Sequence, residues 1–357
     1  MNTRSIAAIY AESEEHLLDH IAPMAEILQI PLIASEDADR ELVQTYYPTV
    51  DFECGDPIEF RLKEFSERFD ALINCKYWKP QLKTIFSHLY GKAPDLIFLP
   101  HGQSDKGFAS PLLAPYAEQD IVLLYGDLLM TMLQSLNIEL QRFLIIGDFR
   151  RKYYEKHRSF YDNLAKEKIF SKLREDRPAL LYAPTWMDAD RSTSFFDWGA
   201  AVASQLPSDW NLIVKVHPLL ELRSPSQYYS MMKHFENLPN TLLVSSFPPV
   251  HAILNRVDAY LGDFSSVGYD FLYYKRPMFF IPNPNLPTAR LHQCGHILGQ
   301  TDPVFSLIEN YPRSKNAEFL RQKQEALYRF AFSDIPEEML RINLRLGKEE
   351  RIQHSMH

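Results

Sequence analysis

Residues 257–271 have the sequence VDAYLGDFSSVGYDF. An apolar strand-like run leads through Asp263, Ser265 and Ser266 into a segment with helical spacing. Small hydroxyl residues at such a turn favour anion binding, because the first amides of a helix have no partner inside it. We expect Asp270, further along the same helix, to bind ribose hydroxyls. The stretch predicts a strand-to-helix turn that holds a nucleotide phosphate; the alternative is that Ser265 only caps the helix.

The same alternation of short apolar runs and amphipathic segments extends along the chain in both directions. Strand-like runs cover residues 5–10, 31–34, 71–74, 96–99, 121–125, 143–146, 179–183, 212–216, 241–244, 259–262 and 278–281. Helical spacing covers residues 14–28, 81–90 and 128–136, among others. Such alternation predicts an α/β fold with parallel sheets covered by helices on both faces.

The length of 357 residues suits two α/β domains of ordinary size. Residues 150–172 are polar and aromatic with helical spacing and no strand signal, so we interpret them as the connection between domains. We therefore predict a first domain over residues 1–149 and a second over residues 150–330. The remaining segment, 331–357, reads as a helix that packs across the domain junction.

Composition excludes several classes of function. The formal net charge of −8 argues against a general nucleic-acid binder, which needs a basic face to displace counterions. Cys54, Cys75 and Cys294 are too far apart for a disulfide framework, and no run approaches the ~18 apolar residues of a membrane span. We expect a cytoplasmic protein. Basic residues near the C-terminus suggest peripheral contact with the inner face of the membrane, although a solvated charged helix is the better interpretation.

Two histidines directly follow strand-like runs. His101 stands in the polar turn PHGQSDKG, and His217 comes at the end of the run over residues 212–216, where Pro218 stops the strand. Ligands bind at the carboxyl ends of parallel strands, and an imidazole there can accept a proton from an attacking hydroxyl. A cleft between the predicted domains would bring both histidines toward one substrate. The alternative is a helix-capping turn that happens to contain a histidine.

Two candidate metal sites are weaker signals. Asp188 and Asp190 imitate a metal-binding acidic pair, yet two aspartates in a loop are usually only solvated. His292, Cys294 and His296 alternate as neighbours on a strand would, but a fourth zinc ligand is not evident. We therefore predict neither a metal nor another cofactor.

Several segments together resemble the CDP-glycerol glycerophosphotransferase family, whose members build teichoic-acid-like polymers. The segments are LYAPTW at 181–186, VKVHP at 214–218, DAYLGDFSS at 258–266, YDF at 269–271 and KRP at 275–277. His101 and Gly102 with Lys106 are similar to the His-Gly-x-x-x-Lys element of the family. Gly147-Asp-Phe-Arg150 resembles a degenerate form of its Gly-Tyr-Pro-Arg element.

The resemblance implies a GT-B fold of two Rossmann-like lobes, with the acceptor on the first lobe and a CDP-alcohol on the second. It implies that His101 is the general base and that His217 lies near the donor phosphates and offsets charge as CMP departs. Gly102 and Lys106 would lie on the acceptor side. The residues implied in donor binding are Thr185, Lys215, Asp263, Ser265, Ser266 and Asp270.

The sequence departs from the family pattern at the donor site. Gly262-Asp-Phe replaces the usual Thr-Asp-Tyr, and Met187 and Cys294 stand where arginines are expected. The predicted reaction moves glycerol phosphate or ribitol phosphate from a CDP-linked donor to a hydroxyl of a surface-polymer or lipid-linked acceptor. The alternatives are a GT-B glycosyltransferase or related nucleotide-sugar epimerase using a UDP-sugar, and a non-catalytic binding protein with the same fold.

Overall fold

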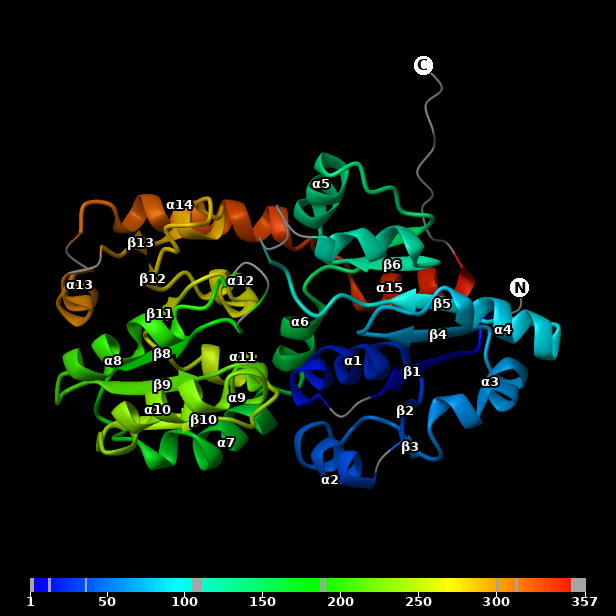
Figure 1. Cartoon of the computed structure of the whole chain (residues 1–357), viewed down its shortest axis with the longest axis horizontal. Coiled ribbons are helices and arrows are strands. Elements are labelled where there is room, and N and C mark those ends of the chain that lie inside the picture. Colours follow the sequence, from blue (N-terminus) through cyan, green and yellow to red (C-terminus); the bar gives the residue numbers. More distant parts are fainter. Residues whose placement is uncertain are drawn as a thin grey trace, which may run out of the picture. The chain divides into compact units, whose positions relative to one another are not determined.

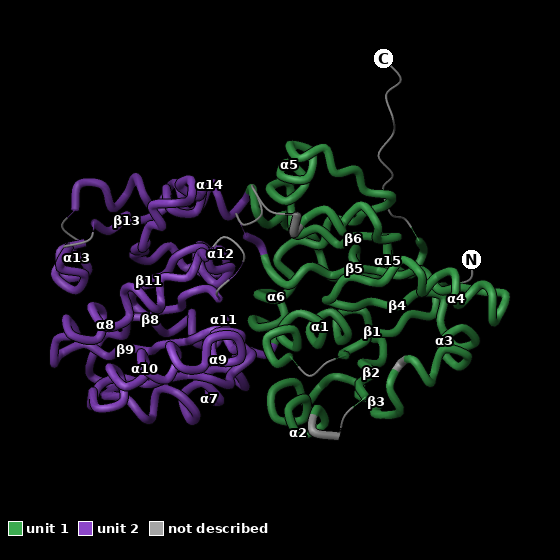
Figure 2. The backbone as a smooth tube through the Cα atoms, viewed as in Figure 1, with its two compact units in different colours: residues 1–102, 111–156, 330–357 green, residues 103–110, 157–329 purple. Residues whose placement is uncertain are grey.

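The computed structural model describes residues 3–11, 14–35, 37–104, 111–186, 188, 191–299, 302–311 and 314–347. The chain divides into two compact units, which Figure 2 shows in different colours. Unit 1 comprises residues 1–102, 111–156 and 330–357, and unit 2 comprises residues 103–110 and 157–329. The division predicted from the sequence, after residues 149 and 330, stays a prediction.

Unit 1 is built on a seven-stranded sheet in which the paired strands run parallel (Figure 1). In spatial order the strands are β3 (Phe52–Cys54), β2 (Leu32–Ala34), β1 (Ile6–Tyr10), β4 (Ala71–Asn74), β5 (Asp95–Phe98), β6 (Ile121–Leu124) and β7 (Phe143–Ile145). The chain first adds strands on one side of β1 and then on the other. This reversal is the mark of a doubly wound fold.

Helices cover both faces of this sheet. Alternate residues of the strands, such as Ile9 and Leu96, form one apolar face that packs against α3 (Leu62–Arg68) and α4 (Gln81–Tyr90). The same face continues over β5 and β6 beneath α5 (Asp127–Ser135). On the other face α1 (Glu15–Leu28) contacts β1 and also α2 (Asp37–Tyr46) and α6 (Phe149–Lys156). Every residue of β1 and of β6 is buried, because helices cover both faces of the sheet.

The last segment of the chain returns to unit 1. α15 (Glu337–Leu346) packs on α1, and the Arg345 guanidinium donates to the Leu28 carbonyl at 2.9 Å. Ahead of it, the Ser333 amide donates to the Tyr125 carbonyl at 3.0 Å, at the carboxyl end of β6. α14 (Ala317–Ala331) precedes this segment, and α15 is a helix within the predicted segment 331–357. Packing of the last helix across a domain junction stays a prediction.

The Gly147-Asp-Phe-Arg150 element serves the packing of unit 1. Gly147 has φ +68°, in the left-handed region, and a β-carbon there would lie 2.2 Å from the Ser333 carbonyl oxygen. Arg150 is buried, pairs with the Asp19 carboxylate and donates from Nε to the Asp19 carbonyl at 3.0 Å. The Tyr47 hydroxyl donates to the same carboxylate at 2.7 Å. Arg150 thus joins α6 to α1.

Unit 2 is built on a six-stranded sheet, again with parallel pairs. In spatial order the strands are β10 (Thr241–Val244), β9 (Asn211–Lys215), β8 (Ala179–Ala183), β11 (Ala259–Gly262), β12 (Met278–Phe280) and β13 (His296–Ile297). Counted from β8, the order is that of the Rossmann sheet, with the reversal between β8 and β11.

One face of the second sheet packs against α8 (Phe195–Gln205), α10 (Pro225–Glu236) and α13 (Val304–Asn310). On the opposite face the Tyr260 ring stacks on Phe271 of α12 (Ser266–Phe271), with ring centroids 5.5 Å apart. α11 (Val250–Leu254) joins α12 there and contacts α7 (Arg158–Lys168). α9 (Pro218–Arg223) links β9 to α10. The predicted fold class, a two-lobed α/β structure with doubly wound sheets, is confirmed.

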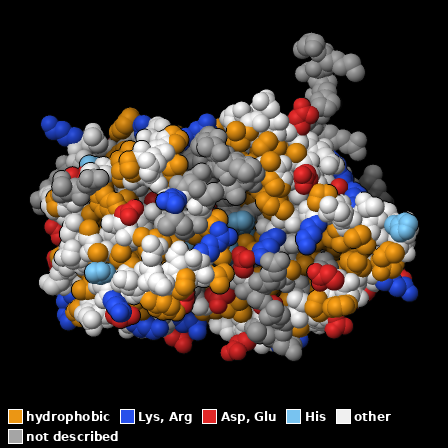
Figure 3. Space-filling view, viewed as in Figure 1, with side chains coloured by type: hydrophobic (Ala, Val, Ile, Leu, Met, Phe, Trp, Pro, Cys, Tyr) orange, Lys and Arg blue, Asp and Glu red, His pale blue; other side chains and the backbone are white. Residues whose placement is uncertain are grey.

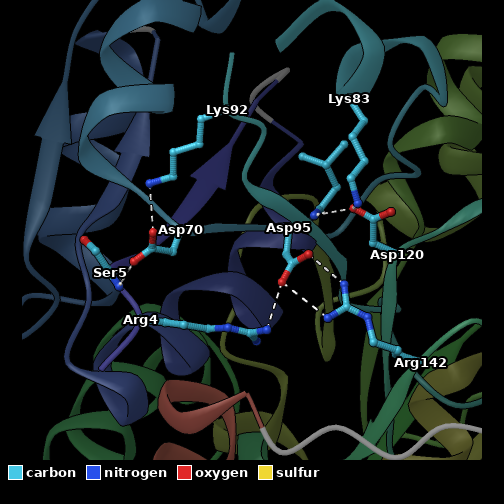
Figure 4. A network of polar contacts seen from close by, with 9 residues as sticks. Arg4, Ser5, Asp70, Lys83, Lys92, Asp95, Asp120 and Arg142 are labelled. Carbon is cyan, nitrogen blue, oxygen red and sulfur yellow. Dashed lines mark hydrogen bonds and ion pairs between the residues drawn. The ribbon is translucent and has the colours of Figure 1, made fainter. Parts of the chain in front are cut away.

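Acidic residues fix the amino-terminal edges of both sheets. Asp70, directly before β4, accepts from the Ser5 amide at 3.0 Å, and Asp120, directly before β6, accepts from the Leu96 amide at 3.0 Å (Figure 4). In unit 2, Asp258, directly before β11, accepts from the Ala179 amide at 2.8 Å. Each carboxylate satisfies a backbone donor at the start of a neighbouring strand.

Arginine and lysine side chains balance these carboxylates in unit 1. Asp95 pairs with Arg4 at 2.9 Å and with Arg142 at 2.6 Å, and Lys92 and Lys83 pair with Asp70 and Asp120 (Figure 4). Elsewhere, acidic and basic side chains are interspersed over the face shown in Figure 3. Within the described ranges, no helix combines the length and apolar character that crossing a bilayer requires.

Candidate functional site

The carboxyl ends of β9, β8 and β11 lie side by side in unit 2, because these strands are consecutive in the sheet. Thr185 and Trp186 follow β8, His217 follows β9, and the turn 263–265 follows β11. The strand order reverses between β8 and β11, and doubly wound sheets bind ligands at the carboxyl edge beside such a reversal. Most donor-side residues predicted from the sequence therefore converge on one edge of one sheet.

Asp263 is a buried cross-link within this edge. Its carboxylate accepts from the Thr185 amide at 2.9 Å, from the Ser194 amide at 2.7 Å and from the Ser194 hydroxyl at 2.8 Å. The side chain is 1% exposed, so these protein donors replace the water that would otherwise solvate its charge. Asp263 thereby fixes the turn after β8 and the start of α8, the geometry of a positioning residue.

Ser265 and Ser266 lie where the chain enters α12. Ser265 occupies the N-cap position with φ −73° and ψ 138°, but its side chain makes no capping hydrogen bond. Ser265 therefore stands at the cap position without the side-chain bond of a serine cap, and its predicted role in phosphate binding stays a prediction. α12 has only six residues. The hydrogen-bond donors available to an anion here are the backbone amides of its first turn and the hydroxyls of the two serines.

The turn over residues 262–268 closes tightly over Tyr260. A β-carbon at Gly262 would lie 2.2 Å from the Tyr260 hydroxyl oxygen, and one at Gly268 would lie 2.7 Å from Leu291 Cδ2. Burial raises the pKa of the Tyr260 phenol well above its ordinary value, so the hydroxyl stays protonated at neutral pH. The two glycines allow the backbone of the turn to lie directly on the aromatic ring.

His217 is the N-cap residue of α9. Its Nδ1 accepts from the Leu219 amide at 3.2 Å, which places the proton of the neutral ring on Nε2. Pro218 begins the helix and ends the strand region, as the sequence predicts. The centroid of the His217 ring lies 6.3 Å from the centroid of the Trp186 indole. The Arg223 guanidinium lies 4.6 Å from the same indole centroid. Trp186 therefore links the ends of β8 and β9.

Trp186 and Arg223 were not singled out as site residues from the sequence. Trp186 belongs to the LYAPTW segment, but an indole in a loop is most often packing, and the arginine that covers it is distant in sequence. Ser194, which donates to Asp263, was also missed, because it is distant from Asp263 in sequence. Sequence spacing carries no signal for contacts between separate strand-end loops.

Lys215 and Asp270 occupy the remaining donor-side positions. Lys215 is the last residue of β9, and its ammonium donates to the Phe247 carbonyl at 3.1 Å. Asp270 is buried within α12. Its predicted role in binding ribose hydroxyls stays a prediction, as does the contact of Lys215 with donor phosphates.

His101 lies at the carboxyl edge of the sheet in unit 1, in the turn that follows β5. Its Nδ1 lies 3.4 Å from the Cys75 carbonyl oxygen, a contact in which the ring nitrogen must be the donor. That tautomer carries its lone pair on Nε2. The Tyr125 hydroxyl donates to the Pro100 carbonyl at 3.0 Å and, having one proton, accepts from Nδ1 of His20 at 2.8 Å. These bonds hold the backbone directly before His101.

Gly102 has φ +111°, which turns the chain sharply after His101. Lys106 lies outside the described residues, as do Met187 and Asp190. His101 and Gly102 belong to unit 1, whereas His217 and the predicted donor-side residues belong to unit 2. The structure thus brings the donor-side residues together within one unit and holds His101 at the corresponding edge of the other sheet.

The candidate metal ligands have other partners. His292 is buried between Phe264 and Phe280, and its Nε2 donates to the Asp263 carbonyl at 3.1 Å. Asp188 accepts from the Ser192 amide at 3.0 Å. Across the part of the chain that the structure describes, no three His, Cys, Asp or Glu side chains are grouped to hold a metal ion. His292 instead supports the backbone of the Asp263 turn.

A cavity of about 540 Å³ lies in unit 2 beside the opposite edge of the sheet. Its lining includes Arg174, Arg256 and Asp258 together with the first residues of β8 and β9. Ligands of doubly wound folds bind at the carboxyl edge, and the cavity is at the amino edge. We therefore place the functional site at the strand-end turns and not in this cavity.

Comparison with known families agrees with the resemblance found in the sequence. Residues 161–283 match the model of the family described as CDP-glycerol:poly(glycerophosphate) glycerophosphotransferase. The matched segment contains the predicted donor-side residues and His217, and it spans β8 to β12. No curated protein sequence matches the chain.

Solved structures share the fold at low sequence identity. The wall teichoic acid polymerase TagF superposes with a TM-score of 0.64 at 15% identity, covering 96% of this chain and 88% of that one. MnaA from S. aureus, solved with UDP, gives 0.63 at 13% identity, covering 96% of each chain. A UDP-GlcNAc 2-epimerase from Neisseria meningitidis, bound to UDP-GlcNAc, gives 0.60 at 10% identity, covering 96% and 99%. The predicted GT-B fold is confirmed.

Proposed function

We propose that this chain is a transferase that moves glycerol phosphate or ribitol phosphate from a CDP-linked donor to a hydroxyl of a surface-polymer or lipid-linked acceptor. The family match over residues 161–283 carries the proposal, because it supports a transferase of CDP-glycerol type. Its residues fold onto adjacent strand ends at the switch point of one sheet. A solved variant of TagF was soaked with CDPG, which agrees with a donor of this class.

Unit 2 would hold the donor. The hydroxyls of Ser265 and Ser266 and the amides at the start of α12 donate hydrogen bonds to the phosphates. Asp263 acts through the backbone, because its carboxylate already accepts from Thr185 and Ser194. His217 presents Nε2–H, the donor that offsets negative charge on the departing CMP.

His101 would be the general base. The acceptor oxygen attacks the phosphorus atom that carries the alcohol, forming a new O–P bond. The bond from that phosphorus to the CMP leaving group breaks, and the hydroxyl proton passes to Nε2 of His101. The Cys75 carbonyl supports this role, because it accepts from Nδ1 and so keeps the lone pair on Nε2. Gly102 and Lys106 would then contact the acceptor.

A UDP-sugar enzyme is the rival assignment, and two solved structures of similar fold contain UDP or UDP-GlcNAc. Both share less identity with the chain than TagF does, and likeness at this level concerns the fold. The family match favours the CDP-alcohol donor.

A turnover assay tests the proposed reaction. Purified protein is incubated with CDP-glycerol or CDP-ribitol and a glycerol-phosphate oligomer, and released CMP is measured. We expect CMP release that depends on the acceptor, and a loss of roughly 10²- to 10⁴-fold in His101→Ala, with donor affinity unchanged. UDP release from a UDP-sugar under the same conditions, without release of CMP, would overturn the proposal.

A further inference from the structure

His101 has a second histidine beside it. The ring of His16, in the first turn of α1, meets the His101 ring edge-on, with centroids 5.9 Å apart and planes at 78°. Both residues lie at the carboxyl edge of the unit 1 sheet, because α1 follows β1 and the His101 turn follows β5. An edge-on contact constrains the plane of the ring that carries the proton-accepting nitrogen.

Glu14 connects His16 to a lysine. Its carboxylate lies 3.5 Å from His16 Nε2 and 2.7 Å from the ammonium of Lys76. Lys76 is in the turn that follows β4. Glu14 is the N-cap residue of α1, yet its side chain makes no capping hydrogen bond. The carboxylate is therefore directed at the two side chains and not at the helix backbone. Through these contacts Lys76, Glu14, His16 and His101 form one row at the ends of β1, β4 and β5, which are consecutive in the sheet.

Other ionisable groups border the row. Tyr10, at the end of β1, and Cys75, before Lys76, are both buried, and burial raises the pKa of each, so both stay neutral at physiological pH. The negative charges of Asp39, Glu15 and Glu14 add to the effect of burial on the pKa of Tyr10. Arg150 acts on Cys75 in the opposite sense.

We propose that Glu14 and His16 are positioning residues for the His101 base. His16 fixes the orientation of the His101 ring, and the Glu14 carboxylate compensates the positive charge that arises on His101 when it takes the acceptor proton. The ion pair with Lys76 holds the Glu14 carboxylate in place. The proton passes from the acceptor hydroxyl to His101 and then to solvent, so neither Glu14 nor His16 gains or loses one. The inference rests on the proposed function of His101.

The pH dependence of turnover separates this role from a structural one. Glu14→Gln removes the carboxylate and leaves the Lys76 charge uncompensated near His101, so protonation of His101 becomes less favourable. The acidic limb of the kcat/KM profile then shifts to lower pH, and kcat falls by about tenfold. The donor KM stays unchanged, because the donor-side residues belong to unit 2.

Matched variants complete the experiment. His16→Phe keeps an aromatic ring against His101 and loses the link to Glu14, but leaves the Glu14–Lys76 pair in place. It therefore lowers kcat with a smaller shift of the acidic limb than Glu14→Gln, and the double variant shifts no further than Glu14→Gln alone. Glu14→Asp keeps the charge and retains the wild-type profile. Glu41→Gln removes an exposed charge of α2 and has no effect. Thermal melting confirms that each variant is folded.

The outcomes distinguish this inference from the proposed function. If His101→Ala abolishes CMP release but Glu14→Gln and His16→Phe keep the wild-type pH profile and kcat, the positioning role is wrong and the base assignment stands. If His101→Ala retains full CMP release, the base assignment fails, and the positioning role fails with it.

Discussion

The carboxylate of Asp263 and the hydroxyl of Ser265 stand two positions apart and have different surroundings. Asp263 accepts hydrogen bonds from Thr185 and Ser194 inside the protein, whereas Ser265 makes no capping bond to α12. The sequence singled out both residues as ligands of the donor. The sequence does not show that Asp263 accepts hydrogen bonds from backbone amides of other loops, because only the folded chain brings those amides close to it.

This difference predicts that substitution of Asp263 mainly lowers stability, whereas substitution of the serines mainly lowers donor affinity. Asp263→Asn replaces an accepting oxygen by an amide that faces the donors of Thr185 or Ser194, so the free energy of unfolding falls by about 2–3 kcal/mol. Ser265→Ala combined with Ser266→Ala lowers the free energy of unfolding less than Asp263→Asn does, and it weakens binding of a CDP-linked donor by roughly 10- to 100-fold. Urea denaturation and donor titration measure the two quantities. Unchanged donor affinity in the double variant would remove these hydroxyls from the phosphate site.

At the scale of elements, the buried strands were predicted well. The strands over residues 71–74, 179–183, 241–244 and 259–262 have the bounds that the sequence indicates. β3 and β13 were missed, because they are edge strands of three and two residues with partly exposed or exposed side chains. Such strands have too little apolar periodicity to be recognised. His292, Cys294 and His296 are not neighbours on one strand, as their spacing suggested. His292 and Cys294 lie in a 3-10 turn that ends at Cys294, and His296 begins β13.

The contact of Ser333 with Gly147 and Tyr125 gives a prediction at this scale. Gly147→Ala adds a β-carbon 2.2 Å from the Ser333 carbonyl oxygen, so this segment must move away. Gly91 is the matched control: its φ is +70°, close to the +68° of Gly147, but nothing lies within 4 Å of the added carbon. Gly91→Ala costs about 1–2 kcal/mol for the left-handed backbone alone.

Hydrogen exchange and denaturation read out the comparison. We expect Gly147→Ala to be the more destabilising variant and to accelerate amide exchange at Ser333, whose amide donates to Tyr125. Gly91→Ala should leave that amide protected. Equal loss of stability in both variants, with Ser333 still protected, would show that the close approach at Gly147 has no energetic weight.

Across the whole molecule, each unit repeats one construction without a shared sequence motif. In both sheets the first three strands are added on one side and the fourth on the other. In both, an aspartate directly before the fourth strand accepts a hydrogen bond from a backbone amide at the start of the first strand. Alternating apolar runs sufficed to predict two doubly wound lobes. The pairing of Asp70 with Ser5 and of Asp258 with Ala179 was not predicted, because the partners are 65 and 79 positions apart.

The identity of the bound nucleotide is the central claim, and binding to the purified protein tests it most directly. CMP, CDP-glycerol, CDP-ribitol, UDP and UDP-GlcNAc are titrated by calorimetry, with thermal melting in parallel. A ligand that binds the native state stabilises it by about 2.7 kcal/mol at a concentration 100 times its Kd. We predict heat and a raised melting temperature with the cytidine compounds, and binding weakened by roughly 10- to 100-fold in the Ser265→Ala, Ser266→Ala variant. A response confined to UDP and UDP-GlcNAc, or none to any of the five, would contradict the assignment.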